Sequence, residues 1–176
     1  TLSLPKLKHA QQMFDECKAL KTLSLDAPLL EDCFAMLSCS VSGAGTVTSV
    51  HLNAPKLTKG SSAFYNCTSL VSFSGDLSSL LYGYHMFYGC KLDGQSVATI
   101  YNSIPTITLP KCTINGTTNL DNMGVLTLGI NSTYSSTAST NTNRLNNFGV
   151  AAGFANWASL KRAFIDKGWD VQWYYA

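Results

Sequence analysis

The sequence predicts a single α/β domain built as a solenoid, in which short repeated units stack side by side. Two observations predict it: four stretches of the chain repeat one pattern, and short segments between them alternate apolar with polar residues. A chain of 176 residues fits one compact domain or one elongated stack. Hydrophobic residues make up 45% of it, which is ordinary for a folded protein.

The repeat is defined by three columns of residues. A leucine marks each unit, a large apolar residue follows it seven positions later, and a cysteine or serine follows three positions after that. The columns are Leu7, Leu30, Leu57 and Leu80; then Phe14, Leu37, Phe64 and Phe87; and then Cys17, Ser40, Cys67 and Cys90. One unit cannot bury its own apolar residues, so the copies are expected to stack and form continuous ladders.

Each unit contains a short segment with the alternation of a strand that has one buried face. Residues 23–25 and 50–52 read apolar, polar, apolar, and a third segment begins with Phe73 but closes on Gly75. Ala-Pro follows the first two segments and ends the pairing there, because proline has no amide hydrogen to donate. The stretch that follows each strand is expected to form a returning arc.

One further set of residues carries a family resemblance. The set is Met13, Phe14, Glu16, Cys17, Ala19, Leu20, Leu23 and Leu25, echoed by Ala63, Phe64, Asn66, Cys67, Ser69 and Leu70. This pattern resembles the leucine-rich repeats of the BspA type, over about residues 1–92. The resemblance implies a right-handed leucine-rich-repeat solenoid with short parallel strands on its concave face. It also implies a bacterial surface protein that binds other proteins or host surfaces.

The chain is expected to divide into a repeat region and a cap. Residues 1–92 would hold about four repeats, because Lys91–Gly94 replaces the next strand entry. The chain begins inside a strand, so the N-terminal end of the array is expected to be truncated. Residues 93–176 are expected to form a C-terminal α/β cap, since a repeat stack needs its open end covered.

Capping residues and periodicity place the elements of this cap. In order, they are a helix over 95–104 capped by Asp93, a strand at 107–109, a strand over 125–130, an exposed Ser/Thr/Asn-rich loop over 131–147, a helix around 157–164 that stops at Gly168, and a strand over 169–173.

The six cysteines are expected to be free thiols rather than metal ligands. Cys17, Cys67 and Cys90 share one column and are expected to stack as small buried side chains. Cys33 and the two others, Cys39 and Cys112, have no partner spacing. Zinc sites use paired Cys-x2–4-Cys modules, which the sequence lacks, so no metal or other cofactor is expected.

The composition also excludes several classes of function. Charged residues are 12% of the chain and the net charge is +2, without the clustered Lys and Arg of a nucleic-acid-binding surface. No apolar run is long enough for a transmembrane segment. The histidines His9, His51 and His85 belong to no recognisable catalytic motif, so we expect no enzyme and no catalytic residue.

Two surfaces are candidates for binding. The outward strand positions are short and polar: Thr22, Ser24, Asp26, Ser49, His51, Asn53, Ser72, Ser74 and Asp76. They would form a polar concave face, whose alternative role is simply to keep the exterior soluble. An aromatic flank is expected from Tyr65, Tyr82, Tyr84 and Tyr88, since tyrosine is favoured in recognition. These tyrosines are equally suited to packing between coils.

From these observations we expect a non-catalytic binding or adhesion scaffold that presents its polar concave face to a protein or glycan partner. The expected location is extracellular or at the cell surface. The alternative is a structural module of a larger assembly, such as a phage virion appendage or a surface stalk.

Overall fold

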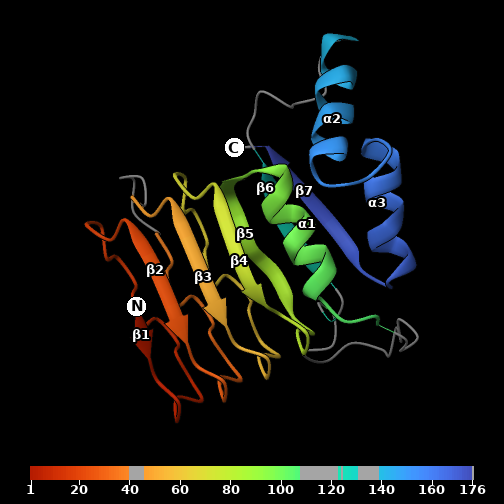
Figure 1. Cartoon of the computed structure of the whole chain (residues 1–176). Helices are drawn as coiled ribbons and strands as arrows, with labels where there is room; N and C mark the ends of the chain where they lie inside the picture. Colours follow the sequence, from red (N-terminus) through yellow and green to blue (C-terminus); the bar gives the residue numbers. More distant parts are fainter. Residues whose placement is uncertain (40–45, 108–122, 124, 131–138, 176) are drawn as a thin grey trace, which may run out of the picture.

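The computed structural model describes residues 1–39, 46–107, 123, 125–130 and 139–175, with the side chains of 139–144 excepted. Within these described ranges the chain forms two parallel sheets, and its three helices lie at the end of the stack where the second sheet is (Figure 1). The elements are β1 (Leu2–Ser3), β2 (Thr22–Asp26), β3 (Ser49–Asn53), β4 (Ser72–Asp76), β5 (Gly83–Leu92), α1 (Gly94–Ser103), β6 (Val125–Ile130), α2 (Ser139–Ala151), α3 (Trp157–Asp166) and β7 (Asp170–Tyr175).

The first sheet confirms the α/β leucine-rich-repeat solenoid. Its order is β1-β2-β3-β4, all parallel, so each coil adds one strand beside the previous one. The register follows the repeat: Leu23 pairs with Val50, which pairs with Phe73. All three side chains are buried, while the polar residues between them lie on the other face. The period of two therefore sets one inner and one outer face for the whole sheet.

The predicted apolar ladders form the core. Leu30, Leu57 and Leu80 are completely buried, and Leu7 packs half-buried against the same cluster at the N-terminal end. Phe64 and Phe87 are also completely buried. Burying each such side chain contributes about 1.5–3 kcal/mol to the free energy of folding. A single coil cannot bury these side chains by itself, so this stabilisation depends on stacking.

Helix α1 covers the free edge of β4, and its position confirms the predicted helix. Asp93 is the N-cap, and its carboxylate accepts a hydrogen bond from the backbone of Ser96. The buried Ser96 hydroxyl accepts from the Phe73 N–H at 2.8 Å and donates to the Val71 carbonyl at 3.1 Å. An unpaired strand edge can pair with another chain and cause aggregation. Helix α1 prevents this because it covers the edge of β4 and provides hydrogen-bond partners for backbone groups at this edge.

The fourth unit differs from the sequence prediction. Its expected returning arc is the ten-residue strand β5, which begins a second parallel sheet of order β5-β6-β7. The arc of the third coil still hydrogen-bonds to it, from the Phe64 N–H to the Met86 carbonyl at 2.9 Å. Close approach to β6 depends on Gly129, where a Cβ would lie 2.5 Å from the carbonyl oxygens of Phe87 and Cys90. Strand β5 keeps positive φ values at His85 and Gly89, and its register with β6 shifts twice, so it remains a kinked arc that pairs with β6.

The C-terminal elements follow the sequence patterns with two corrections. Strands β6 and β7 and helix α3 lie where periodicity places them, and Gly168 follows α3 with a φ of 80°. The predicted loop over 131–147 is wrong for residues 139–147, which belong to helix α2; residues 131–138 lie outside the described residues. Leu145 and Phe148 of α2 are buried, so tertiary packing outweighs the weak helix propensity of Ser, Thr and Asn.

The second correction concerns the strand expected at 107–109. Ile107 lies in irregular chain, and its N–H donates to the Lys167 carbonyl at 2.7 Å; residues 108 and 109 lie outside the described residues. One apolar cluster joins the repeats to the C-terminal elements, from Ala10 to Trp169. The division of the chain at residue 92 stays a prediction.

Candidate functional site

The nine predicted strand positions form three polar rows on the outer face of the first sheet. Because the pairing is in register, the rows are Thr22, Ser49 and Ser72; Ser24, His51 and Ser74; and Asp26, Asn53 and Asp76. We call this set the polar sheet face. All nine side chains are exposed or half-buried, as a surface open to a partner requires.

Hydrogen bonds across the strands hold several of these side chains in place. Asn53 donates from Nδ2 to Oδ1 of Asp26 at 2.6 Å, and Nδ1 of His51 lies 2.9 Å from the Ser74 hydroxyl. Asp76 accepts from the backbone N–H of Ser78 at 2.8 Å. Side chains fixed in this way lose less conformational freedom when a ligand binds.

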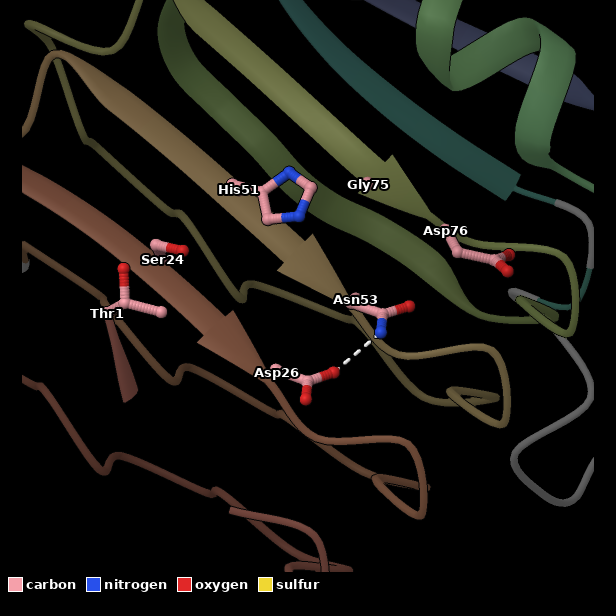
Figure 2. A pocket seen from close by; sticks show the side chains of 7 residues that line it. All are labelled: Thr1, Ser24, Asp26, His51, Asn53, Gly75 and Asp76. Atoms are coloured by element: carbon pink, nitrogen blue, oxygen red, sulfur yellow. Dashed lines mark hydrogen bonds between the residues drawn. The ribbon is translucent and has the colours of Figure 1, made fainter. Parts of the chain in front are cut away.

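A shallow pocket of about 570 Å³ lies at the C-terminal ends of these strands. Figure 2 shows the seven residues that line it and the hydrogen bond between Asp26 and Asn53. They are Thr1, Ser24, Asp26, His51, Asn53, Gly75 and Asp76. Five of the nine predicted residues thus line one hollow, whereas Thr22, Ser49, Ser72 and Ser74 do not. Thr1 and Gly75 were missed, and Gly75 contributes by lacking a side chain.

Three of the four predicted tyrosines lie in one aromatic cluster on the arcs. The rings of Tyr65 and Tyr88 are stacked with centroids 5.1 Å apart, and Tyr84 stacks on His85 at 3.8 Å. Tyr174 of β7 lies 4.0 Å from Tyr88. These five half-buried residues are the aromatic cluster; His85 and Tyr174 were missed, because only the second sheet brings β5 and β7 together.

Two groups of the aromatic cluster have shifted pKa values. Partial burial of His85 lowers its pKa, so the imidazole is neutral at physiological pH. The pKa of Tyr88 is raised, first because of its hydrogen bond with Tyr174 and then because of burial. Both residues therefore present uncharged rings, which suits contact with other flat or apolar groups.

Tyr82 and Tyr84 help to line a second hollow, of about 630 Å³, which we call the arc groove. Isolated bridges link successive arcs here, from His9 to Asp32, from Asp32 to Lys59 and from Lys59 to Tyr82, and the last three of these residues line the groove. The lining residues are Gln11, Asp32, Phe34, Lys59, Ser61, Ser62, Tyr82 and Tyr84. Sequence reasoning found only the two tyrosines, although Asp32, Lys59 and Tyr82 occupy one column of the repeat.

The cysteine column is only partly as predicted. Cys67 and Cys90 are buried, and their thiols donate to the carbonyls of Leu37 at 3.0 Å and Phe64 at 3.2 Å. Cys17 is exposed, which corrects the prediction; among the described coils, only the coil that follows packs against this one. Cys39, for which we expected no partner, has its Sγ 3.9 Å from that of Cys67. Cys112 lies outside the described residues.

Neither surface gathers the groups of a metal centre in the part of the chain that the structure describes. No three His, Cys, Asp or Glu side chains there lie close enough together to hold an ion. The described helices are all too short or too polar to cross a bilayer.

Parallel coils with a polar outer sheet and a hollowed arc side define a leucine-rich-repeat scaffold. A family model described as the BspA type leucine rich repeat region, in six copies, matches residues 8–115 and, in a second alignment, residues 42–156. The chain belongs to this BspA type family. The match extends well beyond residues 1–92, over which the resemblance was noted. The comparisons with curated proteins and with solved structures gave no match.

The general properties of this family are known at a coarse level. Leucine-rich repeats are in general non-catalytic scaffolds that mediate protein binding, and BspA type proteins are typically associated with surfaces.

Proposed function

We propose that this chain is a non-catalytic adhesion scaffold, extracellular or displayed at a cell surface, which binds a protein or glycan through the polar sheet face. The observation that carries the proposal is the in-register polar ladder around the pocket of about 570 Å³. Its hydroxyl, amide and imidazole groups lie together with the two carboxylates of Asp26 and Asp76.

The chemistry of this face favours recognition by hydrogen bonds. The pocket offers donors and acceptors in fixed positions, held by the Asp26–Asn53 and His51–Ser74 contacts. It holds no aromatic side chain of the kind that dominates tight protein interfaces, so binding of micromolar strength is expected. The neighbouring strands repeat the same polar groups at about 4.8 Å, which favours an extended partner that makes repeated contacts.

The test replaces the middle row of the polar sheet face by large charged residues. We expect the combined variant Ser24→Arg, His51→Arg and Ser74→Arg to bind its ligand at least about tenfold more weakly, because two guanidinium groups fill the pocket and the third, at Ser74, crowds the neighbouring strand. The measurement is surface plasmon resonance against arrayed glycans and purified extracellular proteins, with any ligand of the unchanged chain then used for the variant.

The matched control is Gln95→Arg with Asn102→Arg, which adds charge at two exposed positions of α1. This variant is expected to keep full affinity. Equal affinity of the sheet-face variant and the unchanged chain would exclude the polar sheet face, and failure of the unchanged chain to bind any arrayed glycan or protein would contradict the scaffold function itself.

A further inference from the structure

The arc groove contains two aromatic side chains that are separated by a small residue in one column of the repeat. Gln11, Phe34, Ser61 and Tyr84 each lie two positions after the bridge residues His9, Asp32, Lys59 and Tyr82, so they occupy equivalent places in four successive arcs. Phe34 is 47% exposed, which is unusual for a phenylalanine in a chain with a well-packed core. The small Ser61 separates it from Tyr84.

The spacing of the coils makes this gap about one ring wide. Adjacent coils are about 4.8 Å apart, so Phe34 and Tyr84, two coils apart, begin about 10 Å from each other. Stacked rings lie about 4.5–7 Å apart between centroids, and two such contacts span about the same distance. Tyr84 already stacks on His85 with one face of its ring, so a single ring-shaped group fits between its other face and Phe34, above Ser61.

Polar groups border the same space. The Asp32 carboxylate is held by Nε2 of Gln11 at 2.8 Å and by the backbone N–H of Phe34 at 2.9 Å. Lys59 and the hydroxyl groups of Ser61 and Tyr82 complete the lining. One carboxylate and one ammonium group balance in charge, which favours a neutral ligand with many hydroxyl groups.

We propose that the arc groove binds one sugar ring of a neutral glycan, with Phe34 and Tyr84 against the ring's apolar faces and the polar lining against its hydroxyl groups. The site rests on the scaffold function proposed above but uses a different surface from the polar sheet face. A sugar ring suits both sets of groups, whereas an aromatic peptide side chain would leave the polar lining without partners.

The experiment is isothermal titration of the purified chain with neutral oligosaccharides, namely cellohexaose, xylohexaose, maltohexaose and mannohexaose. At least one is expected to bind. Phe34→Ala is expected to weaken that binding at least tenfold, Asp32→Asn several-fold, and Ser61→Tyr to abolish it by filling the gap. Met13→Ala, which shortens another exposed apolar side chain, is the control and is expected to leave the affinity unchanged.

The outcomes separate this site from the proposed function. Absence of binding to all four sugars overturns the groove, as does binding that survives both Phe34→Ala and Ser61→Tyr. A sugar displaced only by the arginine substitutions in the polar sheet face overturns the groove and leaves the scaffold function standing. Tighter binding of a tyrosine-containing peptide than of any sugar in the groove overturns the choice of ligand.

A second inference comes from the cysteine pair Cys39 and Cys67. The two thiols belong to adjacent arcs and their sulfur atoms lie 3.9 Å apart. The backbone N–H of Cys39 donates to the Tyr65 carbonyl at 2.9 Å, which holds the arcs together at this point. A disulfide has a sulfur–sulfur distance of about 2 Å, so closure needs only a small movement. Cys39 is half-buried and thus accessible to a reagent.

We infer that Cys39 and Cys67 form a disulfide between coils when the protein meets a disulfide oxidant. The thiolate of Cys39 attacks oxidised glutathione and releases one glutathione thiolate; the Cys67 thiol then loses its proton, attacks the Cys39 sulfur and releases the second. Two protein thiols are oxidised and one glutathione disulfide is reduced to two thiols. Cys39 is the attacking group because it is half-buried and within reach of the oxidant, whereas Cys67 is completely buried.

Thiol titration under denaturing, non-reducing conditions tests this inference. The untreated chain has six cysteines, and treatment with oxidised glutathione is expected to leave four thiols and raise Tm by about 5–10 °C. Cys39→Ser is expected to keep all five of its thiols, whereas Cys33→Ser, the control at a buried cysteine, still loses two. Six thiols after treatment, or a bridge that excludes Cys39 or Cys67, overturns the inference.

Discussion

Replacing Phe64 by alanine is expected to lower the free energy of unfolding by about 3–5 kcal/mol. Phe64 is completely buried, and its ring lies 5.3 Å from that of Phe87 and 5.8 Å from that of Phe73. These three rings join the arcs to the strands inside the stack, so truncation leaves a cavity that both layers border. Urea denaturation followed by circular dichroism measures the loss.

Phe34→Ala is the matched control for Phe64→Ala, since it removes the same atoms from an exposed ring. The expected loss is about 1 kcal/mol or less. Equal losses for the two variants would contradict the assignment of Phe64 to the shared core. The control also shows whether the Phe34→Ala variant used for sugar binding is folded.

The Gly75→Ala variant is expected to lose about 2–4 kcal/mol of unfolding free energy. Gly75 has a φ of 150°, and a Cβ there would overlap the carbonyl oxygen of Leu52 on the neighbouring strand. Relief of this overlap requires β3 and β4 to separate locally. Because Gly75 lines the pocket of the polar sheet face, the same change is expected to weaken any ligand that binds there.

Gly153→Ala separates backbone strain from steric overlap. Gly153 also has a positive φ, of 84°, but a Cβ at this position would meet no atom within 4 Å. Its expected cost is therefore only that of the left-handed backbone, about 1–2 kcal/mol. If Gly75→Ala cost no more than Gly153→Ala, the close pairing of β3 and β4 at Leu52 would be contradicted.

Repetition made the repeats predictable from sequence. A leucine at one position of a single unit is ambiguous, but the same leucine at Leu30, Leu57 and Leu80 must serve one shared environment. The alternation in residues 23–25 and 50–52 then fixed which side chains point outward. Five of the nine outward residues consequently line a pocket at one end of the sheet.

Elements without a repeated pattern were predicted less well. Residues 139–147 contain few apolar groups, so their helix depends on Leu145 and Phe148, which pack against other elements. Strand β5 shares the sequence of an arc and keeps its positive φ at His85, and its place in a sheet depends on pairing with β6, which begins only at Val125. No local signal reports such a partner.

The arcs show the same limit at the level of the backbone. Gln12, Ala35, Ser62 and His85 have φ values of 50–57° at one equivalent position, although none is glycine. Hydrogen bonds between coils hold this conformation, as from the Ser62 N–H to the Tyr84 carbonyl at 3.0 Å. Hydrogen bonds to neighbouring coils compensate for the backbone strain, so glycine is not required at this position and the residue type does not reveal the positive φ.

The sequence by itself determined the repeating unit, the parallel strands and the polar character of their outer face, because these follow from periodicity within 23–27 residues. Only the tertiary structure decided how the stack ends, which aromatic side chains meet, and which thiols approach. These features depend on contacts between residues that are far apart in the sequence, such as Tyr88 with Tyr174 and Cys39 with Cys67. Such contacts depend on the packed arrangement of the whole chain rather than on any local preference.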